Sequence, residues 1–208
     1  MMVGLLLRPE AIPRDTNQIV DYLTSLADIP NSVTAVILGS RLFDTIGEVT
    51  VFTVAGIGVK VLLTDEQSET RLLGIQDPVI ISLLDFVALL SAFLAVELAI
   101  RGHITPGGGF AAGVAGATSV TLLMITGRLN EIEQFYSKSN AAVLEKQAVI
   151  AFILFAIMSF TSIVYPTSPF SWIPQNVYIP LLNIIAVLKV TIGAWSIIRL
   201  FINKRGII

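Results

Sequence analysis

The sequence RGHITPGGGF (residues 101–110) separates two long apolar segments, residues 79–100 and residues 108–125. It combines the only histidine, a proline and three consecutive glycines at the point where a membrane-spanning helix ends and the chain reverses. A turn that serves only to reverse the chain does not require this combination. Because glycine allows close backbone approach and torsion angles that other residues avoid, the stretch predicts a turn packed tightly against a neighbouring segment.

The composition indicates a polytopic membrane protein. The chain has 208 residues, of which 54% are hydrophobic and 13% are charged, and its mean hydropathy is +0.82. Average soluble domains carry about 25% charged residues. The net charge of −2 gives no indication of nucleic-acid binding. The chain has no cysteine and one histidine, which excludes disulfides, cysteine-ligated centres and a histidine-rich metal site within it, and we expect no cofactor in this chain.

Five apolar segments predict membrane-spanning helices, so the expected fold class is all-α, a polytopic integral membrane protein. A spanning helix needs about 20 residues. The segments are residues 49–63 (starting as early as Thr45), 79–100, 108–125, 148–165 and 178–202. The apolar start, residues 1–7, is too short to span a bilayer.

Residues 8–44 carry more charge than the rest and predict an extramembrane or interfacial segment. Within it, residues 18–27 have the pattern of a short amphipathic helix, and residues 33–38 are apolar. Lysine and arginine in short loops favour the cytoplasmic side. With five spans, one side receives most of them, namely Arg71, Arg128, Lys138, Lys146, Lys204 and Arg205. This bias predicts a multi-pass protein of the cell membrane with a cytoplasmic C-terminus.

Three charged residues fall within the predicted spans. Lys189 lies near the middle of the fifth span, Asp85 lies within the second, and Glu97 lies near its end. A charge at a helix centre costs about 2.5–3.5 kcal/mol on insertion scales. Lys189 should therefore face an acid or a wet cavity, and its candidate partners are Asp85 and an acid of a neighbouring subunit. A structural ion pair and an ion path are both open interpretations for it.

Two further features surround the opening turn. Glu97 lies near a helix end and is able to reach the membrane interface. His103 is suited either to proton relay or to a hydrogen bond with a loop carbonyl. In the third span, Gly109 and Gly113 are spaced as two small residues one helical turn apart, which allows close approach of another helix. We therefore expect the third span to be buried among the others.

Gly102 and His103, followed by PGGGF at residues 106–110, resemble the motif of the B-type subunit of Mrp multisubunit cation/proton antiporters. The resemblance covers residues 77–208 and implies a domain of four transmembrane helices. Its packing and motif residues are Pro106, Gly107, Gly108, Gly109 and Gly113. Residues 179–193 look closer to the version in archaeal membrane-bound hydrogenase and sulfane sulfur reductase complexes.

A second resemblance covers residues 31–63. The sequences NSVTAVI (residues 31–37) and RLFDTIGE (residues 41–48) are similar to the C-terminal portion of the large Mrp A subunit, with Leu42 in place of a usual glycine. The chain therefore looks like a fusion of an A-type segment (1–63) and a B-type domain (77–208), joined by a linker (64–76). The family's A-type piece normally has a helix before the first motif, which residues 1–7 cannot supply. That helix belongs to an upstream subunit, or the start of the chain is displaced.

The resemblance implies a membrane subunit of a multisubunit Na⁺/H⁺ antiporter module inside a respiratory energy-converting complex, with no catalytic activity or redox centre of its own. Its implied partners are the other membrane subunits of the module, a hydrogenase or sulfur-reductase arm, and lipid. The ion-path candidates are Asp44, Glu48, Asp85, Glu97, His103 and Lys189. The carboxylates among them suit a hard cation such as Na⁺. The alternative is a non-conducting scaffold that holds the ion-translocating subunits together, with the glycines as its docking face. An independent small transporter is disfavoured, since the five spans show no repeat.

Overall fold

The computed structural model of the chain describes residues 16–66, 75–165 and 167–205. These residues form helices, and no strand occurs among them. Five helical segments of this part are long and apolar enough to cross a membrane, which confirms the all-α polytopic fold class. They are α4 (Leu42–Leu62), α5 (Pro78–Arg101), α6 (Gly108–Leu123) continued by η2 (Met124–Arg128) and α7 (Leu129–Lys138), α8 (Ala141–Val164) and α9 (Gln175–Arg205).

Local sequence explains where the second helix begins. The Asp77 side chain accepts hydrogen bonds from the backbone N–H groups of Val79 and Ile80, at 2.8 and 3.4 Å, and so caps two amides that lack partners inside α5. Pro78 occupies the first turn, where its missing N–H costs nothing. The predicted span at residues 79–100 agrees with α5 to within one or two residues.

Two helices begin earlier than the hydropathy predicts. The first span was expected from residue 49 and begins at Leu42, and the fourth was expected from residue 148 and begins at Ala141. The added turns carry charged side chains, which lower the local hydropathy without opposing helix formation. Hydropathy thus locates the most apolar part of each helix and not its first residue.

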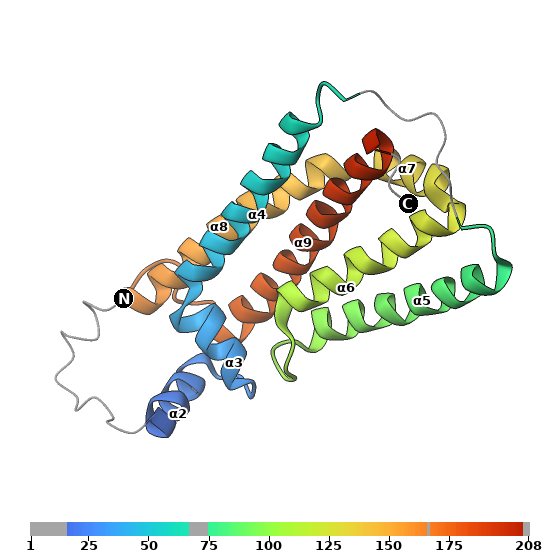
Figure 1. Cartoon of the computed structure of the whole chain (residues 1–208). Helices are drawn as coiled ribbons and strands as arrows, with labels where there is room; N and C mark the ends of the chain where they lie inside the picture. Colours follow the sequence, from blue (N-terminus) through green and yellow to red (C-terminus); the bar gives the residue numbers. More distant parts are fainter. Residues whose placement is uncertain (1–15, 67–74, 166, 206–208) are drawn as a thin grey trace.

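Helix α9 lies at the centre of the molecule. In Figure 1 it runs between an arm formed by α4 and α8 and an arm formed by α5 and α6, and it contacts all four helices. Its most apolar window is 50% buried inside the chain, against 11% for α4 and α5. A charged residue in the middle of α9 is therefore enclosed by protein, whereas α4 and α5 present most of their apolar surface outward.

The segment before α4 lies beside the turn that joins α5 to α6 (Figure 1) and contacts it through Asn31. It consists of α2 (Thr16–Ala27), α3 (Ser32–Thr34) and the π-helical turn η1 (Ala35–Ser40). The predicted helix at residues 18–27 is confirmed as α2. The predictions for residues 1–15, for Arg71 and for most of the linker lie outside the described residues.

Candidate functional site

The middle of α9 carries a fully buried charge. Lys189 is 0% exposed, and its Nζ lies 2.5 Å from Oε1 of Glu145, whose side chain on α8 is 20% exposed. The partner inside the chain is thus Glu145, and the suggestion that Asp85 fills this place was wrong. Since the unpaired charge would be expensive at this depth, the pair satisfies the requirement that the sequence imposes on Lys189.

Two further residues shape the ion pair. The Phe52 ring of α4 has its centroid 5.0 Å from Lys189 Nζ, which is cation–π distance. Gly193 lies one helical turn beyond Lys189 on α9. A Cβ atom there would lie 2.7 Å from Phe52 Cε1, 3.0 Å from Lys189 Nζ and 3.1 Å from Glu145 Oε1. The glycine therefore leaves the space in which the ammonium, the carboxylate and the ring meet.

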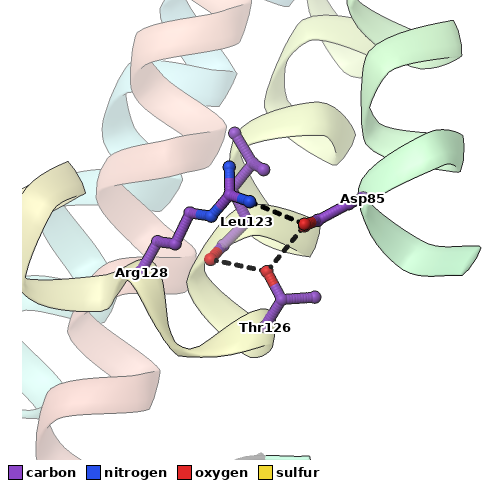
Figure 2. A network of polar contacts seen from close by, with 4 residues as sticks. All are labelled: Asp85, Leu123, Thr126 and Arg128. Atoms are coloured by element: carbon purple, nitrogen blue, oxygen red, sulfur yellow. Dashed lines mark hydrogen bonds and ion pairs between the residues drawn. The ribbon is translucent and has the colours of Figure 1, made fainter. Parts of the chain in front are cut away.

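Asp85 lies in the first half of α5 and belongs to a separate network of polar contacts. Its Oδ2 lies 2.6 Å from Nη2 of Arg128, and its Oδ1 accepts a hydrogen bond of 3.0 Å from the Thr126 hydroxyl (Figure 2). The same hydroxyl also donates to the Leu123 carbonyl at 3.2 Å. Arg128 follows Gly127, whose φ of 92° breaks the helix within η2 and is readily adopted only by glycine. The network fastens α5 to this kink.

Two of the three remaining acidic candidates form short-range surface pairs. Glu97 Oε1 lies 3.5 Å from Arg101 Nη1 at the end of α5, and Asp44 Oδ2 lies 2.6 Å from Arg41 Nη2 at the start of α4. All four side chains are exposed. Exposed pairs of this kind contribute about 0–1 kcal/mol, so neither pair is needed to hold the fold.

His103 lies half-buried in the turn between α5 and α6. Its Nδ1 is buried and has no hydrogen-bond partner among the described residues, so the predicted hydrogen bond from the ring to a loop carbonyl is not present at this nitrogen. Its backbone carbonyl accepts a bond of 3.3 Å from the Asn31 N–H. The turn is thus held by its backbone, and proton relay by His103 stays a prediction.

The two segments that resemble antiporter motifs meet at this turn. Asn31 Nδ2 donates to the carbonyls of Gly102 and Thr105 at 3.0 and 2.6 Å. The Thr34 hydroxyl donates to the Gly102 carbonyl at 2.7 Å. The Asn31 side-chain oxygen meanwhile caps α3. Side chains of residues 31–34 therefore hydrogen-bond directly to the backbone of the turn, which explains why the turn has a defined conformation.

Close packing requires glycine at three of the four predicted positions, whereas Gly108 has no atom within 4 Å of a Cβ and owes its glycine to a φ of 72°. Gly107 has a φ of 146°, and a Cβ on it would lie 2.5 Å from Leu98 Cδ2. On α6, a Cβ on Gly109 would lie 2.7 Å from the Asn183 carbonyl oxygen, and one on Gly113 would lie 2.4 Å from Val190 Cβ. The predicted small-residue face is thus the contact surface between α6 and α9.

A cavity of about 780 Å³ opens between the start of α4 and the glycine end of α6. Its lining joins Asp44 and Glu48 of the first motif to Gly107, Gly108, Gly109 and Phe110 of the second. Two buried polar atoms belong to lining residues and have no hydrogen-bond partner within the described part of the chain, Thr45 Oγ1 and Asn183 Oδ1. The site therefore consists of a mainly apolar cavity with acidic residues in its lining and, beside it, the Lys189–Glu145 pair.

Comparison with known proteins decides the family. A profile for a domain related to the MnhB subunit of Na⁺/H⁺ antiporters matches residues 79–196. The chain belongs to this MnhB-related family. Among solved structures, a chain of the membrane-bound sulfane sulfur reductase, an archaeal respiratory membrane complex, has the same fold, with a TM-score of 0.70 and 23% identity over 97% of this chain and 91% of that one. No curated protein matches the sequence.

The MnhB-related region contains the ion pair and the glycine seam, whereas Phe52 lies before it, on α4. Of the six predicted ion-path residues, Asp44 and Glu48 line the cavity and Lys189 lies in the ion pair. Asp85, Glu97 and His103 contribute to neither. Sequence reasoning missed Glu145 because it precedes the apolar window of α8. The sequence signal was an acidic residue one helical turn before a predicted span. Because α8 begins at Ala141, Glu145 lies within the helix and at the level of Lys189.

Proposed function

We propose that the chain is a membrane subunit of an Na⁺/H⁺ antiporter module and contributes the Lys189–Glu145 pair to the path of the translocated ions. The observation that carries the proposal is a fully buried lysine, paired with a glutamate, at the centre of an MnhB-related fold. Ionisable residues inside membrane segments are costly, and they commonly mark ion and proton pathways.

The chemistry of the pair suits this role. A carboxylate oxygen is a ligand for a hard cation and also a proton acceptor, while the nearby ammonium repels a second positive charge. An arriving proton or Na⁺ at Glu145 weakens its attraction to Lys189, so that the lysine is freed to move. The partial exposure of the Glu145 side chain and the enclosed position of Lys189 are consistent with such an exchange.

Partners follow from the outer surface. The apolar windows of α4 and α5 are only 11% buried within the chain, so they face lipid or other membrane subunits. The fold shared with a chain of the sulfane sulfur reductase complex supports a place inside a respiratory complex of this kind. We expect the redox chemistry of such a complex to reside in other subunits and the C-terminus of this chain to lie in the cytoplasm.

The second candidate function is that of a scaffold, in which the ion pair only connects α8 to α9. The tight α6–α9 seam and the hydrogen bonds between Asn31 and the turn support it, because both make the chain itself rigid. The glycine face, however, is covered by α9 of the same chain and is not free to dock another subunit. If the chain is a scaffold, substitution of the ion pair would leave transport intact, whereas substitution in the seam would disrupt the complex.

Everted membrane vesicles carrying the assembled complex distinguish the two functions. We expect Lys189→Ala and Glu145→Gln to reduce Na⁺-dependent proton movement, followed with a pH-sensitive dye, by about tenfold or more, the change produced by 1.36 kcal/mol of barrier. Arg101→Gln breaks the pair with Glu97, in which both side chains are exposed, and is the control, with transport within about twofold of the wild type. Blue-native gels verify assembly. Normal transport by both ion-pair variants would refute the proposed role.

A further inference from the structure

One aromatic side chain contacts both the cavity and the ion pair. Phe52 lines the cavity, and its ring centroid lies 5.0 Å from Lys189 Nζ. Its ring also packs edge-on against Phe110, which lines the cavity as well, at a centroid distance of 6.0 Å. Two aromatic rings therefore meet in the wall of the cavity, and the ring of Phe52 also reaches the charged groups.

Two residues that line the cavity have buried polar atoms without a hydrogen-bond partner in the described part of the chain. Thr45 is 6% exposed and Asn183 is 0% exposed, yet neither Thr45 Oγ1 nor Asn183 Oδ1 has a partner within the described part of the chain. Thr50 and Thr53 on the same helix donate to carbonyls four residues earlier, at 2.8 and 2.7 Å, whereas Thr45 makes no such bond. Buried polar atoms of this kind are normally satisfied by ordered water.

The volume and the acidic lining residues are consistent with hydration. A cavity of about 780 Å³ is large compared with the roughly 30 Å³ that one water molecule occupies in the liquid. Thr45 Oγ1 and Asn183 Oδ1 are themselves covered, so the groups that water reaches first are the charged side chains at the start of α4. Asp44 and Glu48 bring further oxygen atoms to the lining.

We infer that this cavity is an aqueous access route to the Lys189–Glu145 pair, and that Phe52 is the barrier that closes its inner end. The inference rests on the proposed function, which gives the ion pair a reason to exchange protons with water. Glu48 and Phe52 are four residues apart on α4 and so lie on one face of that helix. Water enters beside Glu48 and stops at the ring. The ring in turn holds the ammonium by cation–π attraction.

Cysteine accessibility tests the route, because the chain has no cysteine of its own. Three single-cysteine variants of the full chain, assembled in membranes, are treated with a water-soluble, positively charged methanethiosulfonate. Thr45→Cys reports on the cavity, Lys189→Cys reports beyond the barrier, and Ala156→Cys lies in the closed core and is the control. Each is combined with Phe52, Phe52→Leu or Phe52→Ala.

We expect Thr45→Cys to react in all three backgrounds and Ala156→Cys to react in none. Lys189→Cys should react about tenfold faster with Phe52→Ala than with Phe52 or Phe52→Leu, a change equivalent to 1.36 kcal/mol of barrier. Leucine keeps most of the volume of the side chain, so it tests whether bulk alone closes the route; the Lys189→Cys variants carry no ammonium, and cation–π attraction therefore plays no part in the comparison. Where Phe52→Ala does not accumulate, Phe110→Ala opens the same contact from α6.

Three results would overturn the inference: an unreactive Thr45→Cys, a Lys189→Cys rate that is equal in all backgrounds, or an Ala156→Cys thiol that reacts together with Lys189→Cys. Labelling does not require transport. A chain that fails the Na⁺ assay in the wild type yet shows labelling dependent on Phe52 therefore refutes the proposed function and leaves the access route standing.

Discussion

A missing methyl group at Gly193 makes room for the ion pair. Any Cβ at this position would lie within 3.1 Å of three side-chain atoms, two of which belong to the charged groups. Helix propensity favours alanine over glycine by about 0.5–1 kcal/mol in a helix interior. Sterics and propensity therefore predict opposite signs for the substitution Gly193→Ala.

We expect Gly193→Ala to lower the free energy of unfolding by about 1–3 kcal/mol, the usual cost of overpacking, and to impair transport. Gly56→Ala is the control, since its Cβ would meet Ile197 at an ordinary 3.7 Å. Thermal unfolding of the purified protein in detergent measures the stability of both variants. If the Gly193→Ala protein is as stable as the Gly56→Ala protein, the ion pair accommodates the added methyl group and the prediction is wrong.

Single residues also show where sequence reasoning ends. That Lys189 needed an acid or a wet cavity follows from the cost of a charge at this depth and from nothing else. Which acid it meets depends on the rotation of α8 and α9 about their axes, which one sequence does not define. Asp85 was a reasonable partner by charge, but Arg128 and Thr126 already occupy its two oxygens.

The contact between α6 and α9 depends on one face of one helix. Gly109, Gly113 and Gly116 place bare backbone against Asn183, Val190 and Thr191. In lipid, association of helices relies on close packing, since the tails are as apolar as the side chains. The packing at this seam is therefore a larger part of the stability than it would be in water.

We expect Gly113→Ala to destabilise the protein by about 1–3 kcal/mol, because its Cβ would lie 2.4 Å from Val190 Cβ. Removing the opposing Cβ should restore part of this loss, so that Gly113→Ala/Val190→Gly is more stable than the sum of the two single changes predicts. Gly58→Ala on α4 meets no atom within 4 Å and should be neutral. If the loss of unfolding free energy in the double variant equals the sum of the losses in the two single variants, the two residues are not in direct contact.

Elements were more predictable than their boundaries. The apolar windows gave five helices, because a bilayer demands long apolar segments with satisfied backbone groups. The early starts at Leu42 and Ala141 were missed since charged first turns carry no hydropathy signal. The π-helical turns η1 and η2 were missed as well. Their geometry arises from tertiary contacts, although Gly127 marks the second with a glycine.

In the molecule as a whole, α9 joins the parts (Figure 1). It carries Lys189, receives the glycine face of α6 and supplies Asn183 to the cavity. The meeting of the two motif-bearing segments at one cavity was not predictable, because hydropathy identifies spans and says nothing about which spans are neighbours. The resemblance of residues 77–208 to an antiporter subunit gave the family, and the fold shows how residues 31–63 pack against that region.

The central claim is that the buried pair serves ion transport and does not merely hold helices together. Replacing one partner leaves an unpaired charge, which costs about 3–5 kcal/mol and confuses function with stability. Replacing both with apolar residues of similar size is often neutral or stabilising. The most direct measurement is therefore Na⁺-dependent proton movement by the double variant Lys189→Met/Glu145→Leu, with its assembly and thermal stability determined in parallel. We predict an assembled, stable complex that has lost this transport. Wild-type transport by the double variant would contradict the claim and assign the pair to structure alone.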